Sequence, residues 1–355
     1  MDMKNNELSK IFETEFNNPT KSDNKIETNI LMDYLANEWI EIAKKLPNPE
    51  PLFGSIWHQG EVGILFSNTG KGKSILGFQL AEAISSGNPI LGQETVKQKA
   101  IYFDFELSSK AFQQRYTNET GETYKFNENF VRVEIDRNKE FENEEYSFED
   151  LIIESIKHQV EKNNAEVIFI DNITFLSAQN ERSKEALALM KLILEVSRKR
   201  NLAILLIAHT PKRDIFKPIQ LEDLAGSKAL SNFTDVVFCI GESIKGSNIR
   251  YIKQLKNRNY PIEFHENNVM ECEVVKENSF LQFKFIDFNT EDEHLKKAIS
   301  DEIEEIQEIL KLKNQGLSNV EIGRRKGVSE TAIRRRLKKY NNSTNGDEYI
   351  NSSIS

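Results

Sequence analysis

A glycine-rich turn between a predicted strand and a predicted helix places the strongest constraint on the fold of this chain. The turn, residues 67–74, reads Ser-Asn-Thr-Gly-Lys-Gly-Lys-Ser; it follows the apolar run 62–66 and precedes a segment, 75–84, with apolar residues at helical spacing. In this arrangement several backbone N–H groups and the positive end of the helix dipole point at one place, which favours a bound phosphate. The pattern predicts a P-loop, with Lys73 at the terminal phosphates and the Ser74 hydroxyl on Mg²⁺.

The loop predicts a nucleoside triphosphate with Mg²⁺ as its ligands. ATP is the expected nucleotide, although no motif distinguishes ATP from GTP. Ser67 occupies the position at which the motif usually has its first glycine. The alternative interpretation is a chance Gly-Lys-Ser sequence in a surface turn, which the flanking strand and helix disfavour. The residues predicted to bind the nucleotide are Ser67, Asn68, Thr69, Gly70, Lys71, Gly72, Lys73 and Ser74.

The composition indicates a protein of the cytosol with an ordinary hydrophobic core and no membrane partner. The chain has 355 residues, of which 38% are hydrophobic. No apolar stretch approaches the roughly 18 residues that span a bilayer. The polar segment 1–25 lacks the apolar core of a signal peptide. Cys239 and Cys272 lack the spacing of metal ligands, so neither a disulfide framework nor a zinc site is expected.

Strands and helices alternate between residues 48 and 290, which predicts an α/β ATPase domain with a mostly parallel sheet between helices. Strands are expected at 62–66, 100–105, 131–135, 166–170, 203–208, 235–240, 249–255 and 280–286, and helices at 74–86, 149–162 and 183–200. Residues 1–47 are expected to form a partly disordered arm with an amphipathic helix at 30–46, which Pro47 ends. A helical linker with a small all-α unit is expected at 291–340, and a polar tail at 341–355.

Two carboxylates at predicted strand ends extend the nucleotide site. Asp171 follows the strand 166–170, and at this position of a P-loop protein an aspartate holds Mg²⁺ through a water molecule. Asn172 comes next, where many P-loop ATPases have a catalytic glutamate. Glu106, at the end of the strand 100–105, is therefore predicted to orient the attacking water, in preference to Asp104 two residues earlier. The alternative is an acid that faces solvent at the strand end.

The glutamate after one core strand, the aspartate after a later one and His209 after the run 203–208 resemble the RecA/DnaB superfamily, and within it the RepA-type hexameric replicative helicases. The resemblance covers about residues 48–288. It implies a RecA-like core and a homo-oligomeric ring, with a hexamer as the expected form. It also implies that His209 bridges the γ-phosphate to loops that bind DNA.

The strand 249–255 and the residues after it resemble the late Lys-x-Arg strand of that family. The resemblance implies that Lys256 and Arg258 enter the nucleotide site of the neighbouring subunit. A guanidinium supplied there stabilises the charge that spreads over a transferring phosphoryl group. The alternative is a basic strand on a solvent face.

The resemblance further implies two loops that face the channel of the ring, residues 176–184 and 210–226. The second loop contains Lys212, Arg213 and Lys217. These cations suit contacts with the phosphate backbone of a single DNA strand, which do not depend on base sequence.

Basic residues concentrate near the C-terminus. Between residues 323 and 340 there are eight Lys or Arg and one acid, Glu330, although the net charge of the whole chain is −9. A small basic region on an acidic chain indicates a localised nucleic-acid contact. A solvated lysine-rich face is the alternative interpretation of the charges taken alone.

The same region, residues 302–340, predicts three short helices. In the first, Ile303, Ile306 and Leu310 share one face. The second begins at the capping box 318–321. Gly327 supplies the following turn, and the third helix, 330–340, directs Ile333 and Leu337 inward.

The stretch 322–337 resembles the helix-turn-helix of resolvases and invertases, with Lys326 where that family has an apolar residue. The resemblance implies that the third helix enters the major groove of duplex DNA. Glu330, Thr331, Arg334 and Arg335 are implied near base edges, and Arg324, Arg325, Arg336, Lys338 and Lys339 at phosphates. The alternative is a three-helix module that binds protein.

Together these patterns predict a ring-forming ATPase that moves on or unwinds DNA during replication or mobilisation of a plasmid or mobile element. Two alternatives stay open. One is a DNA-binding regulator that ATP switches without translocation, and the other is a recombination mediator of the same superfamily.

Overall fold

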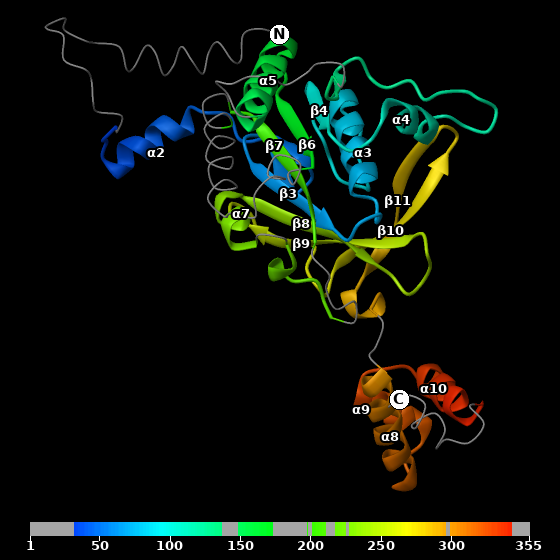
Figure 1. Ribbon diagram of the computed structural model, residues 1–355. Coiled ribbons are helices and arrows are strands. Elements are labelled where there is room, and N and C mark those ends of the chain that lie inside the picture. Colours follow the sequence, from blue (N-terminus) through cyan, green and yellow to red (C-terminus); the bar gives the residue numbers. More distant parts are fainter. Residues whose placement is uncertain are drawn as a thin grey trace, which may run out of the picture. The chain divides into compact units, whose positions relative to one another are not determined.

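The computed structural model describes residues 32–136, 148–172, 197, 201–210, 217–224, 227–295 and 299–342 (Figure 1). The chain divides into two units, residues 1–50 and 51–355. In the first unit the helix α2 (Ala36–Lys44) is shorter than the predicted helix 30–46. It begins after Leu35, whose backbone N–H donates to the Glu38 carboxylate at 2.9 Å. It ends before Pro47, because a proline disfavours helical backbone at the residue that precedes it.

A nine-stranded sheet organises the second unit (Figure 1). Its strand order is β11-β10-β9-β8-β3-β7-β6-β4-β5. The six strands from β8 to β5 run parallel, and β9, β10 and β11 continue the sheet with antiparallel pairing. The strands are β3 (Val62–Ser67), β4 (Ala100–Asp104), β5 (Phe130–Val133), β6 (Val167–Asp171), β7 (Ala203–His209), β8 (Val236–Glu242), β9 (Ile249–Asn257), β10 (Val269–Glu277) and β11 (Phe280–Asn289). A separate two-stranded sheet pairs β1 (Pro51–Phe53) with β2 (Trp57–His58).

This mostly parallel sheet between helices confirms the predicted α/β fold class. The sequence pattern does not predict β1, β2 or β10. Glu271 and Glu273 interrupt the sequence of β10, so it lacks the continuous apolar run of a buried parallel strand. A two-residue turn joins it to β11, and Asn278 in that turn has a left-handed φ of 53°.

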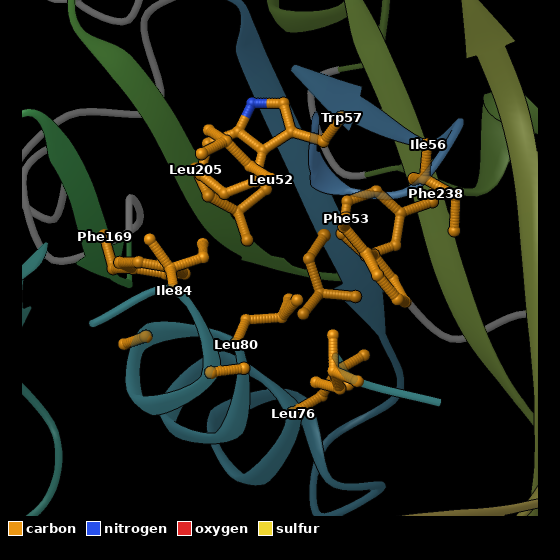
Figure 2. Close-up of a cluster of buried hydrophobic side chains, with 14 of the residues drawn as sticks. Leu52, Phe53, Ile56, Trp57, Leu76, Leu80, Ile84, Phe169, Leu205 and Phe238 are labelled. Carbon is orange, nitrogen blue, oxygen red and sulfur yellow. The ribbon is translucent and has the colours of Figure 1, made fainter. Parts of the chain in front are cut away.

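The parallel strands place alternate side chains in two separate cores, one on each face of the sheet. Leu65 and Leu205 pack with the helix α3 (Lys73–Ser86), in the cluster that Figure 2 shows. Ile64 and Leu206, one position along, pack on the opposite face with the helix α5 (Phe148–Asn163). Since both faces are covered, the strands are continuously apolar and buried.

The other helices described between residues 51 and 295 are short. They are α4 (Ser109–Arg115), α7 (Ser227–Phe233) and the single 3-10 turns η2 (Leu221–Asp223) and η3 (Glu291–Glu293). The sequence analysis does not predict α4 or α7. The helix predicted at 183–200 lies outside the described residues, apart from Ser197. No helix in the described ranges is long and apolar enough to cross a membrane.

Three helices follow near the C-terminus, as predicted: α8 (Ile299–Asn314), α9 (Asn319–Lys326) and α10 (Glu330–Asn342). Their core consists of Ile309, Ile322 and Ile333, with Leu337 packed against it. Ile306 of the apolar face predicted for the first helix is buried, and Ile309, which is not on that predicted face, belongs to the core of the three helices.

Both ends of α9 have the predicted local structure. The Ser318 hydroxyl accepts the N–H of Glu321 at 3.3 Å, and the Glu321 carboxylate accepts the N–H of Ser318 at 2.9 Å, which completes the capping box. Gly327 ends the helix with φ 67°, a conformation that glycine adopts without strain. Gly323 lets the turn close, since a Cβ there would lie 2.7 Å from the Val328 carbonyl oxygen.

Candidate nucleotide site

The predicted phosphate loop lies between β3 and α3, at the edge of the sheet where the parallel strands have their carboxyl ends. The register aligns Ser67 of β3 with His209 of β7, and Asp104 of β4 with Asp171 of β6. Gly72 ends the loop with φ 106°, and a Cβ there would lie 2.7 Å from the Phe283 ring. A glycine is therefore required at this position both by the backbone and by the neighbouring strand.

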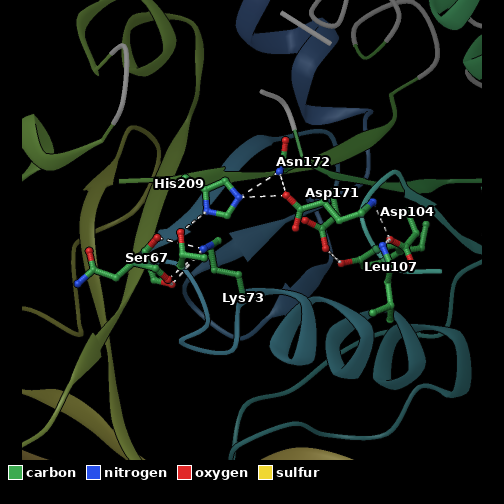
Figure 3. A network of polar contacts seen from close by, with 11 residues as sticks. Ser67, Lys73, Asp104, Leu107, Asp171, Asn172 and His209 are labelled. Carbon is green, nitrogen blue, oxygen red and sulfur yellow. Dashed lines mark hydrogen bonds and ion pairs between the residues drawn. The ribbon is translucent and has the colours of Figure 1, made fainter. Parts of the chain in front are cut away.

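Lys73 is buried beneath the loop that it follows. Its ammonium group donates to the main-chain oxygens of Ser67 at 3.0 Å and of Asn68 at 3.1 Å (Figure 3). Burial lowers the pKa of Lys73 to about 8, against the attraction of the Asp171 and Glu106 carboxylates. The Ser67 hydroxyl lies 3.5 Å from the same ammonium group. A buried ammonium group that donates to these neutral oxygens is well placed to exchange them for phosphate oxygens.

Asp171 and Ser74, the two predicted Mg²⁺ ligands, lie together. The Ser74 hydroxyl hydrogen-bonds to the Asp171 carboxylate, and the buried Tyr102 hydroxyl donates to it at 2.8 Å. Burial raises the pKa of Asp171 to about 6, although these two hydrogen bonds oppose the shift. A carboxylate and a hydroxyl are the hard oxygen ligands that Mg²⁺ prefers, with the remaining positions left for water and phosphate. The residues present therefore fit this ion.

Glu106, Asn172 and His209 form a polar cluster beside the loop. The Asn172 amide nitrogen donates to Glu106 Oε1, and His209 Nε2 lies 3.1 Å from the same oxygen. The other imidazole nitrogen, Nδ1, lies 3.5 Å from the Thr69 hydroxyl of the loop. The structure thus brings together Glu106, the predicted water-orienting acid, and His209, the residue predicted to bridge the γ-phosphate to the DNA-binding loops. It adds Asn172, to which the sequence pattern gives no role.

Asp104 has a different environment from Glu106. It is 2% exposed, forms an ion pair with Arg132 at 2.8 Å and accepts the N–H of Leu107 at 2.9 Å. These contacts fix the turn that follows β4. The side chain of Glu106 is 43% exposed, so it is the carboxylate of this pair that a water molecule can reach.

The tip of the phosphate loop is tied to two neighbouring strands. Asn68 donates to the Glu242 carboxylate at 2.9 Å and accepts the Thr210 hydroxyl at 2.6 Å. Lys71 forms an ion pair with Glu242 at 2.7 Å, and Arg250 donates to the Lys71 carbonyl at 3.3 Å. The sequence does not predict Glu242 or Arg250 at this site, since an acid at the end of one strand and a basic residue near the start of another match no motif.

Lys256 and Arg258 lie near the amino ends of the parallel strands, on the side of the sheet opposite to the phosphate loop. Asn257 pairs with Val236 at the beginning of β8, whereas the phosphate loop follows the end of β3, which runs parallel to β8. Lys256 donates to the carbonyls of Ser231 at 2.5 Å and Thr234 at 2.7 Å. The six residues of β3 separate this edge from the loop by about 17 Å. Neither cation can reach the nucleotide site of its own subunit.

The structure describes only some of the residues that are predicted to contact DNA. The loop 176–184 and the residues Lys212 and Arg213 lie outside the described residues, and Lys217 is exposed. On α10, one exposed face contains Thr331, Arg334, Arg335 and Lys338, and on α9 Arg324 and Arg325 are exposed. Their spacing on α10 is that of a single helix face.

Two basic residues of this unit have partners within it. The Arg336 guanidinium lies 3.3 Å from the Glu305 carboxylate of α8, and its role at a phosphate stays a prediction. Lys326 forms an ion pair with Glu308, which explains how a lysine replaces the apolar residue of the resolvase pattern. Both pairs join α8 to the two helices that follow it.

Comparison with known proteins identifies the family to which this chain belongs. No curated protein matches the chain. Among solved structures, a KaiC-like protein from the hyperthermophilic archaeon Pyrococcus horikoshii OT3 is similar, with 12% identity, a TM-score of 0.44, and coverage of 64% of this chain and 90% of that chain. Residues 31–214, more than half of the chain, match a family described as "AAA domain". This range contains the phosphate loop, Glu106, Asp171 and His209, and the chain therefore belongs to this AAA-domain family of P-loop ATPases.

Proposed function

We propose that this ATPase is a ring-forming, Mg²⁺-dependent motor that acts on DNA, in the manner of RepA- and DnaB-like helicases, during replication or mobilisation of a plasmid or mobile element. The observation that carries the proposal is the position of Arg258 at the sheet edge opposite the phosphate loop. A basic pair that cannot serve its own site suits the site of a neighbour. Repeating that contact head to tail closes a ring.

Each residue of the nucleotide site has a role in the proposal. Lys73 and the loop N–H groups bind the β- and γ-phosphates, and Ser74 and Asp171 hold Mg²⁺, which when bound neutralises charge on the phosphates. Glu106 orients the attacking water. Arg258 of the neighbouring subunit stabilises charge on the transferring phosphoryl group, so that hydrolysis depends on assembly.

The exposed face of α10 supports DNA as the partner. Arg334, Arg335 and Lys338 project from one side of a helix whose other side is fixed by Ile333 in a compact three-helix core. A rigid helix with a basic outer face is the element that helix-turn-helix proteins insert into the major groove. In the proposal this unit binds duplex DNA, while loop cations such as Lys217 follow one strand.

Strand displacement tests the motor. A forked duplex with a labelled strand should be unwound by the wild type in the presence of ATP and Mg²⁺, and not by Lys73→Ala protein. Gel filtration or electron microscopy with a non-hydrolysable nucleotide should show a six-membered ring. ATP hydrolysis without displacement, together with tight binding to one duplex site, would favour the ATP-switched regulator instead.

A matched pair of double variants tests the duplex contact. Arg334→Ala with Arg335→Ala should weaken duplex binding at least tenfold and relax the preference for one duplex site, since each lost base-edge contact removes about 1–3 kcal/mol of discrimination. The control is Lys311→Ala with Lys313→Ala, which removes two exposed cations from α8 of the same unit. Equal losses in both pairs would indicate nonspecific attraction and would contradict the assignment of α10.

A further inference from the structure

The Asp171 carboxylate has a hydrogen-bond donor on the adjacent strand β4, the hydroxyl of Tyr102. This hydroxyl donates to Asp171 Oδ2 at 2.8 Å. Both side chains are inside the protein, since Tyr102 is 0% exposed and Asp171 is 1% exposed. A phenol keeps its proton at neutral pH, so the ionised carboxylate is its natural acceptor. Because the proposed function assigns Asp171 to Mg²⁺, this hydrogen bond acts on a ligand of the ion from within the fold.

The ring of Tyr102 packs against two other aromatic rings, which fixes the direction of its hydroxyl. It stacks with Phe78 of α3, with ring centroids 4.1 Å apart and planes at 14°. It also stacks with Phe169 of β6, with centroids 5.5 Å apart and planes at 14°. Close-packed side chains inside a protein stay in one rotamer. The hydroxyl is therefore held at Asp171 by the packing of the ring as well as by its own hydrogen bond.

Gly77, in the interior of α3, leaves the room that this hydroxyl occupies. A Cβ at this position would lie 2.9 Å from the Tyr102 hydroxyl and 2.8 Å from Ile207 Cδ1. Glycine is unfavourable in the interior of a helix, because it loses more backbone freedom on folding than alanine does. The helix that begins with Lys73 therefore keeps an unfavourable residue where Tyr102 approaches it.

Tyr102 and Ser74 hold the Asp171 carboxylate from two different elements. The Ser74 hydroxyl hydrogen-bonds to it from the first turn of α3, whereas Tyr102 reaches it from the middle of β4. A carboxylate that accepts from two fixed donors cannot rotate freely, so its remaining lone pairs point in set directions. Removing a group that orients a metal ligand in this way typically lowers metal affinity about 10- to 100-fold.

We propose that Tyr102 is a positioning residue for Mg²⁺, which fixes the orientation of the Asp171 carboxylate before the ion and the nucleotide arrive. The proposal rests on the part of the proposed function that assigns Asp171 and Ser74 to Mg²⁺. A tyrosine that only fills the core would do so equally well without its hydroxyl. The positioning role depends on that single oxygen atom, which phenylalanine lacks.

The test measures the binding of a fluorescent, non-hydrolysable ATP analogue as Mg²⁺ is added. Tyr102→Phe should raise the Mg²⁺ concentration that gives half of the increase in binding by about 10- to 100-fold. Binding of the analogue in EDTA should stay close to that of the wild type, since the phosphate loop is unchanged. Tyr116→Phe is the matched control and should leave this Mg²⁺ concentration unchanged. It removes the hydroxyl of another buried tyrosine, which packs edge-to-face with the Phe78 ring.

Each outcome decides the proposal. A raised Mg²⁺ concentration for Tyr102→Phe with an unchanged control supports it, and an unchanged or lower concentration overturns it. Equal shifts in both tyrosine variants would indicate a general change in the aromatic core and would also overturn it. Gly77→Ala repeats the measurement if Tyr102→Phe does not fold. Its Cβ would displace the Tyr102 hydroxyl, so it should shift the Mg²⁺ concentration in the same direction.

Ser74→Ala separates this inference from the proposed function, because it removes a predicted ligand of the ion. If Ser74→Ala binds the analogue with the Mg²⁺ response of the wild type, the assignment of the ion to this site fails. If Ser74→Ala loses that response and Tyr102→Phe keeps it, only the positioning role of Tyr102 is overturned.

Discussion

The two edges of the central sheet both contain ionisable groups, but they hold them in opposite ways. At the carboxyl edge, burial shifts the pKa of Lys73 down to about 8 and that of Asp171 up to about 6. At the other edge, where the parallel strands have their amino ends (the amino edge), Arg258 is paired with Asp235 at 3.0 Å and its side chain is 46% exposed. The first edge contains charges that the fold alone leaves poorly stabilised, and the second contains charges that already have partners.

This difference indicates how each edge meets a ligand. Desolvated groups whose charged forms are disfavoured gain most when a triphosphate and a cation arrive, so the carboxyl edge is built for binding. At the amino edge, Arg258 can enter the site of a neighbouring subunit only if it breaks its contact with Asp235. An exposed ion pair costs little to break, which suits a residue that moves between its own subunit and a neighbour.

The largest effect should come from the amino edge. Arg258→Ala should lower kcat about 10³–10⁵-fold, the contribution of an arginine supplied to a phosphoryl-transfer site. Binding of a fluorescent ATP analogue should change little, since the phosphate loop is about 17 Å away. Turnover and analogue binding measured on the same preparation check both statements.

Mixing experiments decide whether that arginine acts across a subunit boundary. Arg258→Ala protein and Glu106→Gln protein should each be inactive, and their mixture should recover part of the activity, because some interfaces then combine an intact acid with an intact arginine. An Arg258→Ala variant with normal kcat, or a mixture without recovery, would contradict the comparison between the two edges.

At the carboxyl edge, the buried carboxylate of Asp171 should lower the free energy of unfolding when it is ionised. The folded-state pKa of Asp171, about 6, lies above its ordinary value of 3.8. The folded state therefore binds the proton more tightly, and the contribution of this group to stability falls as pH rises from 4 to 6. Without ligands, Asp171→Asn should raise the free energy of unfolding by about 3 kcal/mol at pH 8 and by little at pH 4.

Urea unfolding of the ligand-free variant and wild type at both pH values gives this difference. The variant should also lose hydrolysis, because Mg²⁺ loses a charged ligand. A variant that is less stable than the wild type at pH 8 would show that the ionised carboxylate stabilises the folded state, and the contrast between the edges would fail there.

Lys256 should contribute to stability rather than to binding in the isolated subunit. Its ammonium group satisfies the carbonyls of Ser231 and Thr234 at the end of α7. Lys256→Met keeps the length of the side chain but removes both hydrogen bonds, which should lower the free energy of unfolding by about 1–2 kcal/mol. Arg258→Ala serves as the comparison and should change it less. Equal stabilities of the Lys256 variant and the wild type would favour a role only in the neighbouring site.

The sequence predicts most of the central sheet and the loop, because these depend on local patterns. The continuous apolar runs identify the parallel strands, and the Gly-Lys-Ser sequence before a helical segment identifies the phosphate site. Asp171 is predictable for the same reason, since it directly follows a buried strand. The capping box at Ser318 and the turn at Gly327 are likewise local, and both are present.

What the sequence does not predict depends on contacts between distant segments. Tyr102 reaches Asp171 across 69 positions, and Glu242 reaches Asn68 across 174. Nothing near these residues in the chain indicates the contact. The same holds for the contacts of Asn172 with Glu106 and His209, which form because the strands β4, β6 and β7 end side by side. The place of Ile309 in the C-terminal core likewise depends on Ile322 and Ile333, which come from two other helices.

The smallest effect should come from the ion pair at the amino edge. Asp235→Asn removes the charge that faces Arg258 but keeps an oxygen that can accept the N–H of Val62, a contact of 3.0 Å in the wild type. An exposed pair is worth about 0.2–1 kcal/mol, so the free energy of unfolding should fall by no more than that. Since Arg258 must leave Asp235 to reach a neighbour, kcat should stay the same or rise slightly. A loss of turnover as large as that of Arg258→Ala would mean that the pair acts as a unit within one subunit, and the amino edge would then be structural.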